Sequence, residues 1–180
     1  MEILSRLRKC NYFVAIVVGL GFLLCACIVL LDIVLRRLGS SLGGTDEISG
    51  YVMAVGTAWG MAVAMLELTH VRIDFLRSIT RTKFRIVFDL VSQLALSGTV
   101  TLIAFKCWPV ISTTLKNSSR ANTPLETPLA WVQIPWFLGW VWFALMAWLV
   151  FVVCVMLVLR GEFDATEKAI GVFPEHESTP

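Results

Sequence analysis

The stretch that decides the fold runs from Thr45 to Arg77 and reads TDEISGYVMAVGTAWGMAVAMLELTHVRIDFLR. It opens with two acids, continues for about 19 residues without a charged side chain, and ends in a cluster of charged and polar residues. Because an α-helix rises about 1.5 Å per residue, an uncharged run of this length crosses the roughly 30 Å hydrocarbon core of a bilayer. The stretch therefore predicts a membrane-spanning helix that ends on charged groups.

Small residues recur along one face of this predicted helix. Gly56, Gly60 and Ala64 are four positions apart, so they follow one another on successive turns. Rows of small residues let membrane helices approach each other closely. We therefore expect this row to be a helix-packing face, either within the chain or against another subunit.

Composition extends the membrane prediction to the whole chain. Of its 180 residues, 57% are hydrophobic and 16% are charged, and the mean hydropathy is +0.79, whereas about a quarter of the residues of soluble domains are charged. The predicted fold class is an all-α integral membrane protein with four transmembrane helices, at residues 12–35, 48–68, 84–106 and 134–159. These spans form one domain over residues 1–160, followed by a polar tail over 161–180. The net charge of +2 is too small to indicate binding to nucleic acid.

The segments outside the four spans also carry structural signals. Residues 1–11 mix basic and apolar residues, which predicts a short helix lying in the membrane interface. The same mixture over residues 70–85 predicts a short amphipathic stretch on the membrane surface. Residues 107–133 form the longest segment outside the spans. Pro135 suits the first turn of the fourth helix, because proline lacks the backbone N–H that is unpaired there.

Polar residues within the spans are expected to face other helices rather than lipid. Asp32 and Arg36 are four positions apart near the end of the first span, so the two side chains can form an ion pair on one helix face. The third span carries a polar stripe at steps of four, made of Asp89, Gln93, Ser97 and Thr101.

The distribution of Lys and Arg predicts the orientation of the four spans. The N-terminal segment, the second loop and the tail carry more basic residues than the first and third loops. Basic residues are enriched on the cytoplasmic side of membrane proteins. Both termini are therefore predicted to be cytoplasmic.

The chain offers few residues for catalysis. Its two histidines, His70 and His176, lie outside the uncharged parts of the spans, and its five cysteines include no C-x-x-C pair. Motifs of serine hydrolases, zinc proteases and phosphate-binding loops do not occur. The acids near the span ends, Asp32, Glu67 and Asp89, each have a basic neighbour, which favours ion pairing over a proton path. We therefore expect no catalytic, substrate-binding, metal or cofactor site, a profile that is typical of a subunit.

Several short motifs occur in a distinctive order along the chain. An arginine, Arg36 or Arg37, follows the first span in DIVLRRLG, and Glu47 opens the second span in TDEISGY. Further motifs are Gly60 in TAWGMAVA, the exit sequence His70-Val71-Arg72-Ile73-Asp74, and the pairs Thr123-Pro124 and Pro135-Trp136 before and at the last span. Over about residues 10–160 this order resembles the small membrane subunit (DctQ type) of tripartite ATP-independent periplasmic (TRAP) transporters.

The resemblance implies a non-catalytic subunit of a multi-pass complex in the bacterial inner membrane. Such transporters are sodium-driven and take up an organic acid, such as a dicarboxylate, sialic acid or another sugar acid. A periplasmic binding protein captures the substrate, and a large multi-span subunit moves it as an elevator and holds the sodium sites. This chain would be a scaffold for the large subunit and part of the docking surface for the binding protein, without a cofactor of its own.

Three groups of residues are assigned hypothetical roles on this basis. Gly56, Gly60 and Ala64 would pack within the bundle or against the large subunit. A second group would anchor the second span at the cytoplasmic face, and consists of His70, Arg72 and Asp74. A third group would form the periplasmic rim that contacts the binding protein, and consists of Arg36, Arg37, Glu47 and Pro124.

Two alternatives remain from the residues themselves. One is a small four-span membrane oxidoreductase, which would need paired cysteines at an outer face. The other is a stand-alone proton-coupled carrier that uses Asp32 and Asp89.

Overall fold

The computed structural model describes residues 2–67 and 82–161. The helices in these ranges are α1 (Glu2–Arg37), α2 (Thr45–Leu66), α4 (Thr82–Asn117) and α5 (Ala130–Leu159). Each contains a segment that is long and apolar enough to cross a bilayer, which agrees with the predicted all-α membrane fold of four spans. Within the described ranges there is no β-strand, only an isolated bridge between Arg120 and Pro128.

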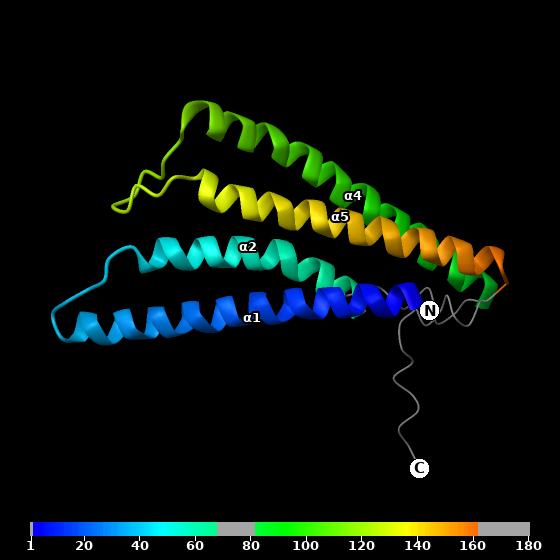
Figure 1. The fold of residues 1–180 in the computed structure, drawn as a ribbon, viewed down its shortest axis with the longest axis horizontal. Helices are drawn as coiled ribbons and strands as arrows, with labels where there is room; N and C mark the ends of the chain where they lie inside the picture. Colours follow the sequence, from blue (N-terminus) through cyan, green and yellow to red (C-terminus); the bar gives the residue numbers. More distant parts are fainter. Residues whose placement is uncertain (1, 68–81, 162–180) are drawn as a thin grey trace, which may run out of the picture.

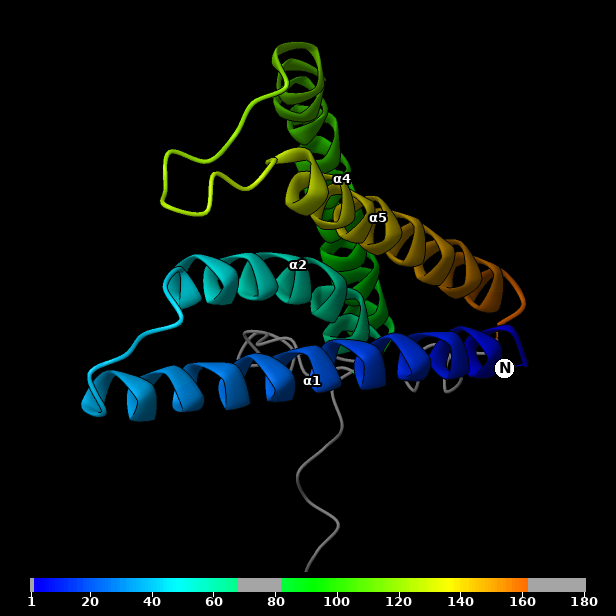
Figure 2. The same cartoon turned by 60° about the vertical axis from the view of Figure 1, so that its left-hand side comes forward.

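The helices form a row rather than a square bundle (Figure 1). α1 packs on α2, α2 on α5, and α5 on α4, whereas α1 and α5 make only slight contact. The α1–α2 loop (residues 38–44) and the α4–α5 loop (residues 118–129) lie at the same end of the molecule, which we call the loop end (Figure 1). Figure 2 shows that α4 diverges from α1 and α2. The outer helices, α1 and α4, are therefore connected through the two central ones, α2 and α5.

The first helix is longer than its predicted span. α1 is continuous from Glu2 to Arg37, so the prediction of a separate interfacial helix over residues 1–11 is wrong. The physical reason is that neither glycine nor proline occurs before Tyr12, and nothing else interrupts the hydrogen bonding of the helix there. The other predicted amphipathic segment falls largely on residues 68–81, outside the described residues.

Two prolines lie inside helices rather than at their ends. α4 passes through Pro109 and continues to Asn117, beyond the predicted end of the third span at residue 106. α5 begins at Ala130, before Pro135, because the carbonyl of Leu129 already accepts a backbone hydrogen bond from Gln133 at 2.9 Å. A proline in a helix removes one backbone hydrogen bond without necessarily ending the helix, and neighbouring groups in a membrane protein can replace that bond. The carbonyl of Pro135 itself accepts a hydrogen bond from the indole of Trp59 on α2, at 2.9 Å.

The core lies at the seam between α2 and α5. Gly139 of α5 is so close to α2 that a Cβ added there would lie 2.8 Å from the Cβ of Ala58 and 2.8 Å from the ring of Trp59. The buried residues that continue this seam include Ala62, Met65, Leu66, Phe143, Met146, Ala147, Val150 and Cys154, with Val100 of α4. Small residues thus bring the two central helices together, and larger apolar ones fill the space beyond them.

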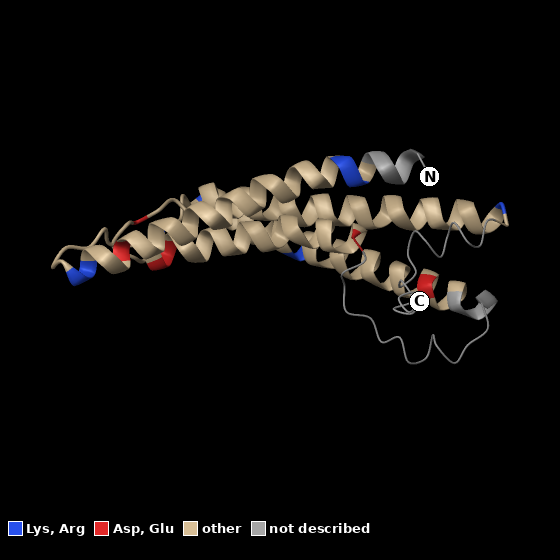
Figure 3. Cartoon of the chain, turned by 90° about the horizontal axis from the view of Figure 1, so that it is seen from below, with Lys and Arg blue, Asp and Glu red and all other residues tan. Residues whose placement is uncertain are grey.

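Charged residues gather toward the two ends of the molecule (Figure 3). α5 contains no Lys, Arg, Asp or Glu, and α1 contains none between Lys9 and Asp32. In α4, Lys106 lies within the helix and marks the end of its uncharged stretch. The uncharged stretches of α1 and α5 are long enough to cross the hydrocarbon core of a bilayer.

Candidate functional site

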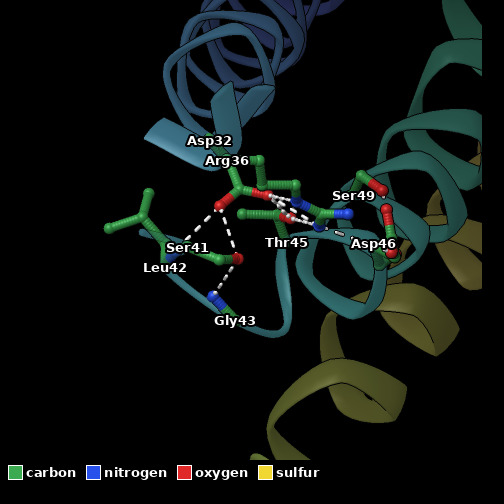
Figure 4. A network of polar contacts seen from close by, with 8 residues as sticks. All are labelled: Asp32, Arg36, Ser41, Leu42, Gly43, Thr45, Asp46 and Ser49. Carbon is green, nitrogen blue, oxygen red and sulfur yellow. Dashed lines mark hydrogen bonds and ion pairs between the residues drawn. The ribbon is translucent and has the colours of Figure 1, made fainter. Parts of the chain in front are cut away.

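At the loop end, Asp32 of α1 organises the connection to α2 (Figure 4). Its side chain is only 1% exposed and accepts hydrogen bonds from the backbone N–H of Leu42 (2.8 Å) and the hydroxyl of Ser41 (3.1 Å). The hydroxyl of Thr45, the first residue of α2, donates to the same carboxylate at 2.8 Å. One buried carboxylate therefore holds the end of α1, the loop and the beginning of α2 together.

Arg36 completes this arrangement, which we call the Asp32 clamp (Asp32, Arg36, Ser41, Leu42 and Thr45). The guanidinium of Arg36 lies 2.7 Å from the Asp32 carboxylate, so the predicted ion pair is confirmed. Its Nη2 also donates to the Thr45 hydroxyl at 3.3 Å. Because half of the Arg36 side chain is exposed, one side of the guanidinium remains at the surface. Arg37 is exposed as well.

Glu47 lies in the first turn of α2, beside the α4–α5 loop. The hydroxyl of Tyr51 donates to its Oε1 at 2.5 Å, and the hydroxyls of Thr123 and Thr127 lie beside the same carboxylate. Glu47 was expected to be a residue of the outer rim. The structure places it at the loop end, where its carboxylate is bonded to Tyr51 of the same helix and its Oε2 is buried without a hydrogen-bond partner among the described residues.

The α4–α5 loop also covers the beginning of α2. Gly44 has a left-handed backbone with φ of +72°, and an added Cβ would collide with the side chain of Leu125. Glycine suits this position because it adopts positive φ without a steric penalty and lets the loop approach. Pro124 of the predicted rim is exposed next to this contact. Arg36, Arg37, Glu47 and Pro124 therefore all lie at the loop end, and their contact with a binding protein stays a prediction.

The row of small residues on α2 does not act as one face. Gly56 is buried against the ring of Phe22 of α1, so it packs within the chain. Gly60, one turn further, has no described atom within 4 Å of an added Cβ. Ala64 is half-buried. The close contact with α5 is made instead by Ala58 and Ala62, which are fully buried and lie on a different side of the helix.

The polar stripe of α4 faces other helices, as predicted. Asp89, Gln93 and Ser97 are buried, and the amide of Gln93 donates to the carbonyl of Ala147 on α5 at 3.2 Å. Thr101 is more exposed, but its hydroxyl accepts a hydrogen bond from the indole of Trp148 at 2.9 Å. The stripe therefore joins α4 to α5.

The predicted cytoplasmic anchor, His70, Arg72 and Asp74, lies outside the described residues. Within those residues, no group of three or more His, Cys, Asp or Glu side chains is placed to hold a metal ion. The five cysteines are free thiols, and three of them are buried.

Sequence reasoning predicted the Arg36 partner of Asp32 but missed its other side-chain partners, Ser41 and Thr45, and the Tyr51 partner of Glu47. Tyr51 follows Glu47 by four positions, a spacing that places the two side chains on one helix face and that gives a usable signal. Ser41 and Thr45 have no such signal, because their contacts with Asp32 depend on how the chain turns between α1 and α2.

Comparisons with known proteins bear on the identity of the chain. Searches of curated proteins and of solved structures give no match. A comparison with protein families matches residues 25–157 to the family described as tripartite ATP-independent periplasmic transporters, DctQ component. The match covers most of the chain and includes the Asp32 clamp, α2, α4 and nearly all of α5. The protein therefore belongs to the DctQ family and is a small membrane subunit of a TRAP transporter.

Proposed function

We propose that this chain is a non-catalytic scaffold in a sodium-driven transporter that takes up an organic acid across the bacterial inner membrane. A large membrane subunit carries the substrate and sodium sites, and a periplasmic protein delivers the substrate. The present chain holds a fixed position beside the large subunit and contributes part of the surface on which the binding protein docks. Family membership and the packing of α2 support this proposal.

The observation that carries the scaffold role is the open face of α2, made of Met53, Thr57 and Gly60. These residues follow one another at helical spacing, and Met53 is 62% exposed although α2 lies between two neighbours in the row. A small residue in an otherwise bulky face lets a second helix approach closely. The open face therefore suits a helix of the large subunit.

The loop end supplies the proposed docking surface for the binding protein. Arg37, Asp46 and Pro124 are exposed there, and half of Arg36 is exposed as well. The Asp32 clamp holds the α1–α2 loop to both of its helices, and Leu125 of the α4–α5 loop packs against Gly44 at the beginning of α2. In this scheme both termini are cytoplasmic, the loop end is periplasmic, and His70, Arg72 and Asp74 anchor α2 at the cytoplasmic face.

Replacing Gly60 by Leu tests the scaffold role. A Cβ added at Gly60 has no described atom of this chain within 4 Å, so we expect the fold to be retained while a partner helix is pushed away. We expect Gly60→Leu to abolish co-purification with the large subunit and transport by the whole complex. Gly98→Leu on α4 is the matched control, because Gly98 also has open space around it, and it should leave both unchanged.

Two results would contradict the proposal. If the Gly60→Leu complex assembles and transports normally, the open face is not the subunit contact. If the purified chain alone carries an organic acid into liposomes, it is a carrier in its own right rather than a scaffold.

Docking is tested separately from assembly. A double substitution of Arg36 and Arg37 by Gln should weaken binding of the periplasmic protein to the assembled complex, measured by surface binding assays. Co-purification with the large subunit should persist. Unchanged binding of the periplasmic protein would remove these arginines from the docking surface.

A further inference from the structure

One charged residue of the described chain lies away from the two ends of the molecule. Lys106 of α4 is exposed, and its side chain makes no hydrogen bond or ion pair within the part of the chain that the structure describes. The charged residues before and after it on α4 are Asp89 and Lys116, 17 and ten residues away. At 1.5 Å per residue these separations are about 25 and 15 Å along the helix. No other charge of α4 is therefore close to Lys106.

Contacts between α4 and α5 place Lys106 opposite the interior of α5. The ring of Trp108 lies 5.9 Å from the ring of Phe137, and the hydroxyl of Thr101 accepts a hydrogen bond from the indole of Trp148. Lys106 lies between these two contacts on α4, closer to the first. It is therefore level with the part of α5 just beyond Phe137, and α5 contains no charged residue.

The same level continues from α5 into α2. Gly139, two residues after Phe137, lies against Ala58 of α2, with 2.8 Å between an added Cβ and the Cβ of Ala58. Ala58 is 11 residues after Glu47 and nine before Glu67. These separations correspond to about 16 and 14 Å along the helix. Since the hydrocarbon core is roughly 30 Å thick, Ala58 lies near its middle.

The contact between α2 and α1 gives an independent measure of this depth. Gly56 of α2 packs on the ring of Phe22. Phe22 lies 13 residues after Lys9 and ten before Asp32, so it also lies near the middle of an uncharged stretch. The contacts across the row therefore place Lys106 near the middle of the bilayer.

A lysine at this depth needs a partner, and two sources of negative charge do not supply one. Charged side chains within spans are rare and almost always pair with other groups. The nearer headgroup layer is about 15 Å away, at the loop end, and the Cα–Cβ bond of a helical residue points toward the helix N-terminus, away from that layer. The described residues of a second copy of this chain offer no carboxylate at this level, because Asp32, Glu67 and Asp89 lie at the ends of the uncharged stretches.

We propose that Lys106 forms an ion pair with an aspartate or glutamate on a membrane-spanning helix of the large subunit, near the middle of the bilayer. This inference rests on the proposed function, because it takes the large subunit as the partner. The contact is additional to the open face of α2, since α4 lies on the other side of α5 and diverges from α2 (Figure 2).

The side chains around Lys106 indicate a contact through long side chains rather than through close helix packing. Leu102 and Phe105 are 58% and 71% exposed and lie beside Lys106 on the outer side of α4. Because both are bulky, a partner helix remains too far away to touch the backbone of α4. A leucine at Gly98, about 12 Å along the helix from Lys106, has the same bulk as Leu102 and is compatible with this contact.

The first experiment measures assembly. This chain is co-expressed with the large subunit and captured by an affinity tag, and the large subunit recovered with it is quantified. Lys106→Arg keeps the charge and should recover nearly as much as the natural chain. Lys106→Met leaves a buried carboxylate unpaired, and Lys106→Glu places two like charges together, so recovery should fall several-fold and roughly tenfold or more, respectively. Lys116→Met, at the loop end of the same helix, is the matched control and should change nothing.

The second experiment identifies the partner carboxylate. Benzoylphenylalanine in place of Lys106 is activated by light in the assembled complex, and the crosslinked peptide is located by mass spectrometry. We expect a crosslink to a membrane-spanning helix of the large subunit that contains an aspartate or glutamate. Changing that residue to lysine in combination with Lys106→Glu should restore at least half of the natural recovery.

The isolated chain separates pairing with a partner from a role in folding. Lys106→Met removes a charge that has no partner in the described chain, so the midpoint of thermal unfolding in detergent should stay the same or rise. A lower midpoint would show that Lys106 stabilises its own chain and would overturn the proposal. Natural recovery of the large subunit with Lys106→Glu, or no restoration by the exchanged charges, would also overturn it.

Failure of this inference is distinguishable from failure of the proposed function. If Gly60→Leu abolishes co-purification and Lys106→Glu does not, only the ion pair is wrong. If the natural chain does not co-purify with the large subunit, the proposed function is wrong, and the ion pair with it.

Discussion

The α1–α2 joint and the α2–α5 seam hold neighbouring helices together by different means. At the α1–α2 joint, a buried carboxylate accepts hydrogen bonds from a side chain of its own helix, from the loop and from the next helix. At the α2–α5 seam, Gly139 and Ala58 let two helices approach until their backbones nearly touch. Within a membrane, helices associate through close packing and hydrogen bonds rather than through the hydrophobic effect. Hydrogen bonds hold the α1–α2 joint, and close packing holds the α2–α5 seam.

The position of each contact explains which means is used. The joint lies where helices end, and backbone N–H groups such as that of Leu42 need acceptors there. The seam lies along helix interiors, whose backbone groups are already hydrogen bonded within each helix. Close packing is therefore the main source of attraction between the two helices there. A polar joint should therefore be sensitive to lost acceptors and a packed seam to added volume.

The largest effect is expected at the seam. Gly139→Leu places a bulky side chain where even a Cβ lies 2.8 Å from Ala58, and overpacking of this kind costs about 1–3 kcal/mol or more. We expect the variant to lose the monodisperse peak of the folded chain in size-exclusion chromatography. Gly98→Leu, with open space around it, should elute as the natural chain does. A folded Gly139→Leu chain would show that the seam tolerates separation.

The next largest effect is expected at the joint. Asp32→Ala removes the acceptor for the N–H of Leu42 and the hydroxyl of Thr45, and it leaves Arg36 without its nearest carboxylate. The midpoint of thermal unfolding in detergent should fall clearly, and Asp32→Asn should fall less because one acceptor oxygen remains. Asp46→Ala is the control, since Asp46 is exposed and lies 3.9 Å from Arg36. Equal midpoints for Asp32→Ala and Asp46→Ala would show that the clamp does not stabilise the fold.

A smaller effect is expected where the two loops meet. Gly44→Ala and Gly43→Ala both place a Cβ on a left-handed backbone, which costs on the order of 1 kcal/mol. Only the added Cβ of Gly44 collides with Leu125, so Gly44→Ala should be the more destabilising of the two in the same thermal assay. Adding Leu125→Ala to Gly44→Ala should remove the difference. If the two single variants unfold alike, the contact between the loops is too loose to matter.

The smallest effect is expected for the hydrogen bond between α4 and α5. Gln93→Leu loses the bond to the carbonyl of Ala147, and such bonds between membrane helices average about 0.6 kcal/mol. It also removes the side-chain oxygen of Gln93, which is buried without a hydrogen-bond partner. We expect a change in unfolding free energy of less than about 1 kcal/mol. A loss above 2 kcal/mol would mean that this bond, rather than apolar packing, holds α4 to α5.

Local patterns predicted the parts of the structure that depend on neighbours in sequence. Four apolar helices, the ion pair between Asp32 and Arg36, and the inward-facing polar stripe of α4 all follow from spacing and hydropathy. The prediction based on Pro135, which placed it in the first turn of the last helix, was less successful. Pro135 lies within α5, as Pro109 lies within α4, because surrounding helical segments are long enough to retain the structure around one missing hydrogen bond.

The candidate site was predicted in part. The four residues assigned to the rim lie at one end of the molecule, but the position of Glu47 beside Thr123 and Thr127, which are far away in sequence, could not be read from local spacing. The row Gly56, Gly60 and Ala64 has a regular spacing that suggests a single face. In the structure, Phe22 covers the first of these positions and no described atom fills the space beside the second.

The sequence by itself determined that this protein spans a membrane with helices, because the length and apolarity of each span are local properties that the bilayer requires. It also determined which side chains share a helix face, because helical periodicity sets that spacing. Only the tertiary structure decided that the helices form a row with α2 and α5 at its centre, and that Ala58 and Ala62 meet α5 while Gly60 faces outward. The rotation of each helix about its axis results from the packing of residues far apart in the chain, and periodicity alone leaves that rotation undetermined.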